Sequence, residues 1–302
     1  MMDQRMKLAV LGGDERQIYM ARALAQRGFL VRAWGLGACA DRICPAEIAE
    51  TPKDALEGAS VVLLPLPASL DGVRVSCPLD KDASLRLSAI FEFWGGGLLL
   101  GGKFPPMMVS YGEREEIRLL DYFDDDILQI RNALPTAEGA LAIAMRELPV
   151  TVDGISAAVI GYGRIGSVLA DKLYALGAHV YLYARKERDL ARAAQRHLSP
   201  MRLSVETGVN SLTRLPRSCR VIFNTVPSLL FTREVLETLP RDCLYIDLAS
   251  APGGIDWVAA RELGIRTVWG TALPGRCVPE TAGNILAETV DEIIRSEGVN
   301  LC

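Results

Sequence analysis

Three glycines, Gly161, Gly163 and Gly166, stand at the spacing of a dinucleotide-binding turn in the segment GYGRIG. In such a turn the first glycine makes a tight bend, the second lets the backbone approach a pyrophosphate, and the third lets a helix pack closely on a strand. Amides at the start of that helix then face the phosphates. We therefore predict a dinucleotide site whose turn residues are Gly161, Gly163, Arg164, Ile165 and Gly166.

The residues after the next strand indicate which dinucleotide binds. An acid at that point accepts hydrogen bonds from the ribose 2′-hydroxyl of NAD, but here the sequence reads Ala184-Arg185-Lys186. No acid stands there to repel a 2′-phosphate, and two cations follow to bind it, which favours NADP. The alternative is that Arg185 and Lys186 only begin a solvated helix, and the nearby Glu187 weakens the NADP prediction.

The elements that must position this turn are a strand, a helix and a second strand between residues 157 and 186. Further apolar strands at 221–224 and 244–248 end on the same sheet edge if the sheet is parallel. The residues that follow them are expected to form walls for the nicotinamide end. They are Asn224, Thr225, Val226, Pro227, Asp247, Leu248, Ala249 and Ser250.

The first part of the chain also begins as strand, helix and strand, with strands predicted at 7–11 and 30–34. Its turn contains Gly12-Gly13-Asp14 and lacks the third glycine, so it departs from the nucleotide pattern. A small anion bound at this helix start, with Arg16 as its counter-charge, is one interpretation. A glycine turn capped by Asp14, with Arg16 in solvent, is the other.

The expected architecture is α/β, with two Rossmann-like, doubly wound parallel-sheet domains and a cleft between them. We place the N-terminal substrate domain at residues 1–131, the nucleotide domain at 149–278, and a closing helix of the first domain at 279–302. A helix over 132–148 is expected to join them, with Pro135 and Thr136 at its start and Glu138 in its first turn.

Composition excludes several other classes of protein. The 302 residues carry 33 basic and 37 acidic side chains without a long run of one sign, so no nucleic-acid or membrane-surface footprint is expected. No apolar segment reaches the roughly eighteen residues of a membrane span, and the N-terminus lacks a signal-peptide core, so we expect a cytoplasmic location. The seven scattered cysteines and two histidines predict neither disulfides nor a metal site.

Five segments together make the sequence resemble the A subunit of dipicolinate synthase, an oxidoreductase family of endospore formation. They are GGDERQ at 12–17, NALPTAEGA at 132–140, GYGRIG at 161–166, DLASAPGGID at 247–256 and LPGRCVPETAGNIL at 273–286. The resemblance implies NADP-dependent oxidation of dihydrodipicolinate, or of its hydroxylated tetrahydro precursor, to dipicolinate in the mother cell. It also implies the flavoprotein-like B subunit of dipicolinate synthase as partner, in a homo- or hetero-oligomer. The wider architecture is similar to that of formate/glycerate dehydrogenases and of alanine dehydrogenase.

The implied product is a flat pyridine with two carboxylates, so its pocket should present cations and helix-start amides. The candidate substrate residues are Gly13, Asp14, Arg16, Lys103, Asn132 and Arg276. The resemblance favours Arg16 and Asn132 in this role, whereas Lys103, which is otherwise an exposed loop lysine, and Arg276 stay open. Thr136 and Glu138 are the catalytic candidates, with Glu138 the acid to test as base. His179 and His197 are expected far from the site, which counts against a 2-hydroxyacid dehydrogenase. Another NADP-dependent oxo- or hydroxyacid oxidoreductase, or a non-catalytic cofactor-binding partner of the B subunit, remain alternatives.

Overall fold

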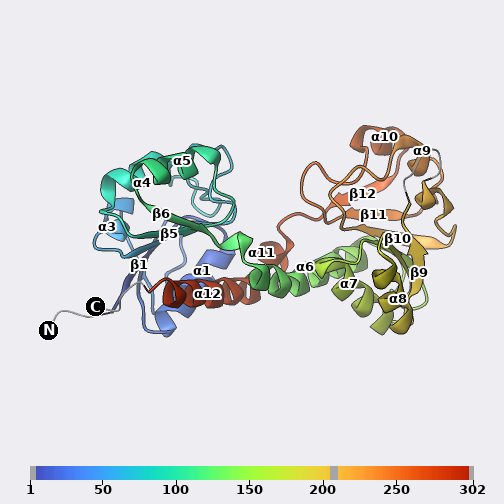
Figure 1. Cartoon of the computed structure of the whole chain (residues 1–302), viewed down its shortest axis with the longest axis horizontal. Coiled ribbons are helices and arrows are strands. Elements are labelled where there is room, and N and C mark those ends of the chain that lie inside the picture. Colours follow the sequence, from blue (N-terminus) through green and yellow to red (C-terminus); the bar gives the residue numbers. More distant parts are fainter. Residues whose placement is uncertain (1–4, 205–209, 299–302) are drawn as a thin grey trace. The chain divides into compact units, whose positions relative to one another are not determined.

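The computed structural model describes residues 5–204 and 210–298, which form two compact units. Unit 1 is made of Met1–Asn132 and Val278–Cys302, and unit 2 is Ala133–Cys277. Each unit is built on its own six-stranded parallel sheet (Figure 1). Each sheet is covered by helices and has a core of its own.

The sheet of unit 1 has the strand order β3-β2-β1-β4-β5-β6. The polypeptide reverses its winding direction between β1 and β4, and this is the switch point at which ligands bind in open α/β sheets. The strands are β1 (Lys7–Leu11), β2 (Leu30–Trp34), β3 (Glu47–Ile48), β4 (Val61–Leu63), β5 (Leu98–Gly101) and β6 (Arg118–Asp121). The helices of this unit are α1 (Glu15–Gln26), α2 (Ala40–Ile43), α3 (Pro52–Leu56), α4 (Leu87–Phe93), α5 (Pro106–Arg114) and α12 (Pro279–Ser296).

Alternate residues of each strand face opposite sides of this sheet, as the two-residue period of a strand requires. Leu8 and Val10 pack on the side of α1 and α12, whereas Ala9 and Leu11 pack on the side of α3 and α4. Both faces are therefore covered, which explains why the strands are almost wholly apolar.

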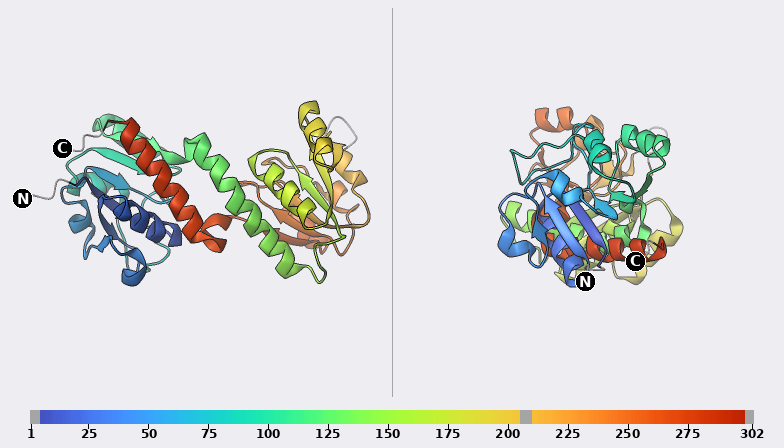
Figure 2. Two further views of the ribbon diagram at one scale, coloured as in Figure 1. Left: turned by 90° about the horizontal axis from the view of Figure 1, so that it is seen from below. Right: turned by 90° about the vertical axis from the view of Figure 1, so that its left-hand side faces the viewer.

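Helix α12 lies alongside α1, and the last part of the described chain thereby completes unit 1 (Figure 2). Gly283 makes the close approach possible, because a Cβ built there would lie 2.5 Å from the carbonyl oxygen of Arg16 and 2.6 Å from the Cβ of Tyr19. Arg27 donates to Asp291 across the pair at 3.1 Å. The helix start at Pro279 agrees with the sequence expectation.

The sheet of unit 2 has the order β12-β11-β10-β7-β8-β9, with its switch point between β7 and β10. The strands are β7 (Ser156–Ile160), β8 (His179–Ala184), β9 (Ser199–Arg202), β10 (Cys219–Asn224), β11 (Leu244–Asp247) and β12 (Arg266–Trp269). The helices are α7 (Arg164–Ala175), α8 (Glu187–Gln195), α9 (Arg233–Leu236), α10 (Trp257–Glu262) and α11 (Leu273–Cys277). The predicted class of two doubly wound parallel α/β domains is confirmed.

Helix α6 (Asp126–Glu147) begins earlier than the sequence predicted. Pro135 lies inside this helix, so Thr136 does not cap it and Glu138 is not in its first turn. Asp125 accepts a hydrogen bond from the backbone N–H of Leu128 at 2.6 Å, and this acid caps the true start. The expected start was wrong because proline is favoured in a first turn but is also tolerated, at a cost, in a helix interior.

Candidate functional site

The glycine turn after β7 has the geometry that each of its three glycines predicts. Gly161 has a φ of +98°, and a Cβ there would meet Thr225 Oγ1 at 2.4 Å. A Cβ on Gly166 would lie 2.1 Å from the carbonyl oxygen of Gly161, so this position admits no side chain. Around Gly163, in contrast, nothing in the described chain lies within 4 Å of a built Cβ. The turn is closed beneath Gly161 and Gly166 and open at Gly163, where a ligand would approach the backbone.

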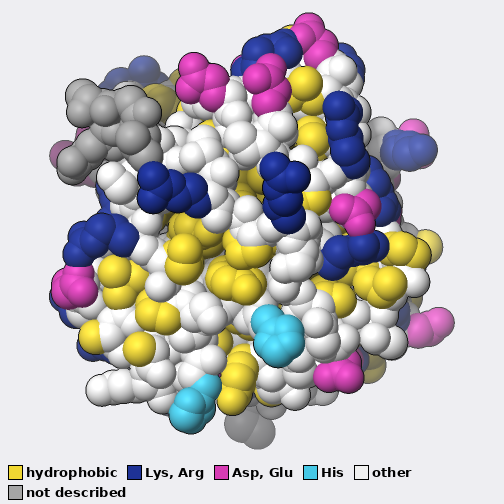
Figure 3. All heavy atoms as spheres, turned by 90° about the vertical axis from the view of Figure 1, so that its right-hand side faces the viewer, with side chains coloured by type: hydrophobic (Ala, Val, Ile, Leu, Met, Phe, Trp, Pro, Cys, Tyr) yellow, Lys and Arg dark blue, Asp and Glu magenta, His cyan; other side chains and the backbone are white. Residues whose placement is uncertain are grey.

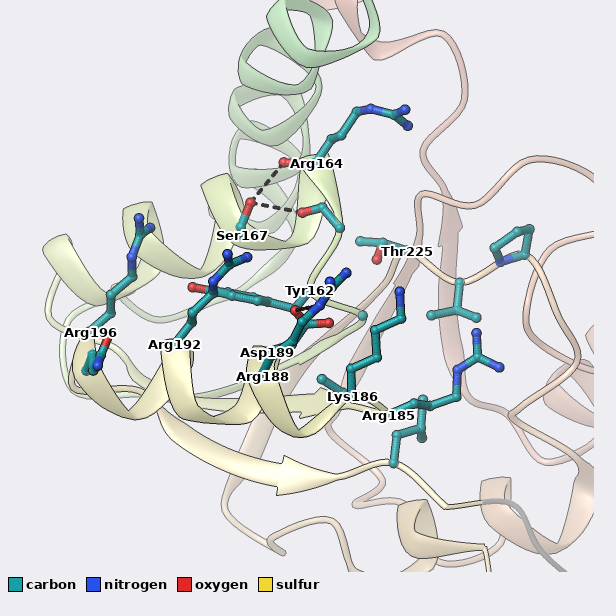
Figure 4. Close-up of a pocket in the computed structure, with 17 residues that line it drawn as sticks. Tyr162, Arg164, Ser167, Arg185, Lys186, Arg188, Asp189, Arg192, Arg196 and Thr225 are labelled. Carbon is teal, nitrogen blue, oxygen red and sulfur yellow. Dashed lines mark hydrogen bonds and ion pairs between the residues drawn. The ribbon is translucent and has the colours of Figure 1, made fainter. Parts of the chain in front are cut away.

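A groove of about 910 Å³ lies over this turn, at the carboxyl ends of β7, β8 and β10 (Figure 4). It is therefore at the switch point of the unit 2 sheet. Of the predicted cofactor residues, those that line it are Gly161, Gly163, Arg164, Arg185, Lys186, Thr225, Val226 and Pro227. Ile165 and Gly166 follow within the same turn but do not line the groove.

The lining of the groove is strongly cationic in a chain whose net charge is −4. Among the lining residues that the structure describes, Asp189 is the only acid, and the cations are Arg164, Arg185, Lys186, Arg188, Arg192 and Arg196. Figure 4 shows the side chains of α8 and of the β8 end arranged along one wall, opposite the start of α7. Basic side chains are also spread over the outer face of the molecule in Figure 3. The groove is thus suited to a ligand that carries several negative charges.

The acids nearest to the end of β8 are already paired. Glu187 is 77% exposed and forms an ion pair with Arg202 from β9. Asp189 pairs with Arg188 at 3.6 Å. Neither carboxylate is left as an unmatched charge beside Arg185 and Lys186, so the acid that weakened the sequence argument for a 2′-phosphate is neutralised by its own partner.

Tyr162, within the glycine motif, lies in the groove toward α8 (Figure 4). Burial raises the pKa of its hydroxyl, and the nearby Asp171 and Asp189 add to this rise while Arg196 and Arg192 oppose it. The phenol therefore stays protonated at neutral pH and can donate a hydrogen bond.

The expectation that Asn224 and Asp247 touch the cofactor is not supported by their contacts. Both are fully buried, and Asn224 Nδ2 donates to Asp247 Oδ1 at 3.0 Å. Leu248, Ala249 and Ser250 do not line the groove. A strand end places its residues at one edge of the sheet without saying whether each side chain points outward or into the core, so a cofactor contact of these residues stays a prediction.

Sequence reasoning missed much of the groove's outer wall. The missed lining residues are Tyr162, Ser167, Ala184, Arg188, Asp189, Arg192, Gln195, Arg196 and Leu203. A signal for part of this wall was present, because Arg188, Arg192 and Arg196 are spaced by four residues and so share one helix face.

In unit 1, the turn after β1 holds a buried ion pair. Asp14 caps α1 and its carboxylate accepts from Arg16 Nε at 2.9 Å and from Arg16 Nη2 at 2.8 Å. The same Nη2 donates to the carbonyl oxygen of Leu66 at 2.7 Å. The predicted cap is confirmed, but Arg16 is only 5% exposed, so the solvated alternative is wrong. The charge of Arg16 is matched within the protein by Asp14.

The other substrate and catalytic candidates lie in varied settings. Lys103 is exposed, with Nζ 4.9 Å from the centre of the Phe123 ring, and Arg276 donates to the Thr271 carbonyl oxygen at 3.5 Å. Asn132 and Thr136 are half-buried on α6. Glu138 is exposed rather than buried, and it accepts from Lys172 Nζ at 2.9 Å.

Two further findings bear on the chemistry of the chain. His179 and His197 are both exposed, neither lines the groove, and histidine side chains are visible on the face in Figure 3. Across residues 5–204 and 210–298, no group of three or more metal-ligating side chains is placed to hold an ion, and no helix is long and apolar enough to span a membrane.

The two parallel sheets, with a glycine turn at the switch point of the second, define a two-unit Rossmann-type protein. An L-alanine dehydrogenase structure shares this fold, with a TM-score of 0.68 at 13% identity and coverage of 98% of this chain and 91% of that chain. The predicted similarity of architecture to alanine dehydrogenase is thereby confirmed.

Comparison at higher identity is more specific. Residues 7–123 match the family of the N-terminal domain of the dipicolinate synthase A subunit. The dipicolinate synthase A subunit of Bacillus subtilis (strain 168) is 27% identical over 290 residues, which are 96% of this chain and 96% of the relative. The crystal structure of the dipicolinate synthase A subunit from Bacillus halodurans matches with a TM-score of 0.85 at 28% identity, covering 97% of this chain and 99% of that chain. The resemblance to the A subunit of dipicolinate synthase is confirmed over almost the whole chain.

Proposed function

We propose that this chain is an NADP-dependent oxidoreductase that forms dipicolinate, acting as the A subunit of a dipicolinate synthase. The observation that carries the proposal is the match to the dipicolinate synthase A subunit over 96% of the chain. The cationic groove over the glycine turn of this chain supports it. In this proposal the substrate is dihydrodipicolinate, or its hydroxylated tetrahydro precursor, which first loses water to give dihydrodipicolinate before hydride and proton are removed. The setting is the cytoplasm of a sporulating mother cell, with the B subunit of dipicolinate synthase as the partner in a homo- or hetero-oligomer.

The residues of the groove fit a dinucleotide. The open backbone at Gly163 and the amides at the start of α7 would hold the pyrophosphate, because helix N-termini favour anions. The closed packing at Gly161 and Gly166 keeps that turn rigid. When bound, the nicotinamide supplies a hydride acceptor at its C4 atom. Thr225, Val226 and Pro227 would form the wall nearer to that ring.

The choice of NADP over NAD rests on charge. Ala184 ends β8 where NAD-binding folds place an acid, and Arg185 and Lys186 follow it into the groove. The pairing of Glu187 with Arg202 leaves those two cations available for a 2′-phosphate dianion. A guanidinium fork matches a phosphate in two parallel hydrogen bonds, so Arg185 would contribute shape as well as charge.

For the substrate, we propose that Arg16 binds one carboxylate at the carboxyl edge of the unit 1 sheet, beside Gly13. Asp14 shares the same guanidinium, so the substrate carboxylate would compete with an internal acid. Lys103, Asn132 and Arg276 remain proposed substrate contacts.

For the proton, water is the better acceptor than Glu138. That carboxylate is 46% exposed and already paired with Lys172 at 2.9 Å, so it is not free to take a proton from the substrate. Thr136 would then orient the substrate rather than accept a proton. Formation of an aromatic ring favours the oxidation, so orientation in a dry site and loss of the proton to water can suffice.

The decisive experiment mixes the purified chain, with and without the B subunit, with freshly made dihydrodipicolinate and either NADP or NAD. Reduced cofactor and dipicolinate are both followed. Coupled appearance of NADPH and dipicolinate is the expected result. NADPH oxidation by simple 2-oxo acids without dipicolinate formation would instead identify a different reductase. Nucleotide-dependent thermal stabilisation with no turnover in any mixture would identify a non-catalytic partner of the B subunit.

A further inference from the structure

The outer wall of the groove holds more positive charge than the glycine turn and the β8 end explain. Arg188 and Arg192 lie on α8, Arg196 is the residue that caps its C-terminal end, and all three line the groove with Arg185 and Lys186. Figure 4 shows Arg192, Arg188, Lys186 and Arg185 in a row along this wall. These cations differ in whether the protein itself already neutralises them.

Sorting them by partner singles out one residue of α8. Arg196 forms an ion pair with Asp171 of α7, and Arg188 pairs with Asp189 at 3.6 Å. No carboxylate within the described parts of the chain pairs with Arg192. A cation kept without an internal partner beside a concave site is a candidate ligand for an anion.

The surroundings of Arg192 suit a phosphate. Its side chain lies next to Tyr162 in Figure 4, and burial raises the pKa of that phenol so that it remains a hydrogen-bond donor. Arg192 is six residues after Lys186, a separation of about 9 Å along a helix axis. Two long side chains separated in this way can approach one phosphate from opposite sides.

We propose that Arg192 binds the 2′-phosphate of the dinucleotide together with Arg185 and Lys186, and is therefore a residue that determines NADP specificity. This inference rests on the proposed function, because it presumes that a dinucleotide occupies the groove. In this inference Arg192 of α8 contacts the phosphate directly, whereas a long-range attraction by the positive charge of the groove would need no contact.

The test measures binding by calorimetry and needs no turnover. Arg192→Ala is compared with the wild type for NADP, NAD and the fragment 2′,5′-ADP. We expect the Kd for NADP and for 2′,5′-ADP to rise about 10- to 100-fold, as for loss of a charge-assisted hydrogen-bonded pair, while the Kd for NAD changes less than about 2-fold. Arg192→Lys keeps the charge but loses the planar guanidinium fork, so its Kd for NADP should lie between those of the wild type and Arg192→Ala.

Arg196→Ala is the matched control, because it removes the same charge from the same groove wall, but from the C-cap residue of α8, which is paired with Asp171. It should change the Kd for NADP much less than Arg192→Ala does. Thermal melting of both variants checks that the exposed substitutions leave unit 2 folded.

Four outcomes would overturn the inference. Equal losses from Arg192→Ala and Arg196→Ala that disappear at 1 M salt, where the Debye length is about 3 Å, would show a long-range field only. Equal losses of NADP and NAD would show no role at the 2′-phosphate. Wild-type affinity of Arg192→Ala for NADP would reject the contact and leave the proposed function standing, whereas a wild-type chain that binds neither dinucleotide would reject both.

Discussion

Asn224 Nδ2 donates to Asp247 Oδ1 at 3.0 Å and thereby ties the end of β10 to the end of β11. Both side chains are fully buried. The Asp247 carboxylate also accepts from the backbone N–H of Ala249 at 3.0 Å and of Gly254 at 2.7 Å. One carboxylate thus anchors the loop after β11, while Asn224 anchors the Val226 carbonyl of the loop that walls the groove.

We predict that Asp247→Asn lowers both the stability of the chain and its affinity for dinucleotides. The amide has one acceptor oxygen where the carboxylate has two, so a buried N–H donor loses its partner, at a cost of about 1–3 kcal/mol. Asp247 holds Asn224, and Asn224 holds the Val226 carbonyl of the groove wall. Loosening the first contact should therefore displace the loop at Val226 and raise the Kd values for NADP and NAD together. Urea unfolding and calorimetry measure the two effects.

Asp242→Asn is the control for this prediction, because Asp242 is 57% exposed and forms an ion pair with Arg220. The same chemical change there should cost less than about 1 kcal/mol. Equal effects of the two substitutions would contradict a positioning role for Asp247.

Substitutions at two glycines of the turn should affect stability and nucleotide binding separately. Gly166→Ala places a Cβ 2.1 Å from the Gly161 carbonyl oxygen, so we predict a fall in thermal stability of unit 2. Gly163→Ala meets no described atom within 4 Å and should melt as the wild type does. Its methyl group would occupy the space through which a pyrophosphate approaches, so nucleotide binding should fall at unchanged stability. Differential scanning fluorimetry measures the stability and calorimetry the binding. Wild-type nucleotide affinity of a folded Gly163→Ala variant would show that the turn holds no phosphate.

How far the sequence predicted this protein depends on the kind of signal each element carries. The glycine turn and the buried strands β1, β2 and β7 were predictable, because glycine spacing and apolar runs are local properties. The start of α6 was not, since local rules favour Pro135 in a first turn, whereas the structure places it inside the helix, where proline is tolerated at a cost. The ion pair of Asp14 with Arg16 was half predicted, as the cap was expected and the buried guanidinium was not.

The site residues also divide into those that local sequence predicts and those that depend on contacts between distant elements. Arg185 and Lys186 follow directly from their place after a strand, whereas Arg192 becomes part of the groove only when α8 packs beside the glycine turn. Asp247 and Asn224 were expected to face the ligand, and their inward orientation depends on hydrogen bonds between strands that are distant in sequence. The neutralisation of Glu187 by Arg202 is also a contact between separate elements, the start of α8 and the end of β9.

Cys77 provides a pH-sensitive test of the turn after β1, because its Sγ would lie 2.7 Å from a Cβ built on Gly12 in that turn. Burial raises the pKa of the Cys77 thiol to about 11, because desolvation disfavours the charged thiolate. At pH 8 about 0.1% of it is thiolate, so iodoacetamide should label it far more slowly than the exposed Cys44 and Cys277. Site-resolved mass spectrometry measures the three rates, and the Cys77 rate should still climb between pH 9 and 11. Labelling of Cys77 as fast as Cys44 at pH 8 would show that the turn is open in solution.

The last prediction concerns whether Arg16 serves the substrate or only the fold. Arg16→Ala removes the guanidinium that donates to the Asp14 carboxylate and to the Leu66 carbonyl oxygen, and leaves the Asp14 carboxylate only backbone N–H donors at the start of α1, so stability falls by about 1–3 kcal/mol in either case. Asp14→Asn is the discriminating change. Asparagine still caps α1, but it neither neutralises Arg16 nor repels a dianionic substrate. If Arg16 binds a substrate carboxylate, Asp14→Asn should lower the KM for the dicarboxylate several-fold at unchanged kcat. The same KM in Asp14→Asn and the wild type would confine Arg16 to holding the turn after β1 together.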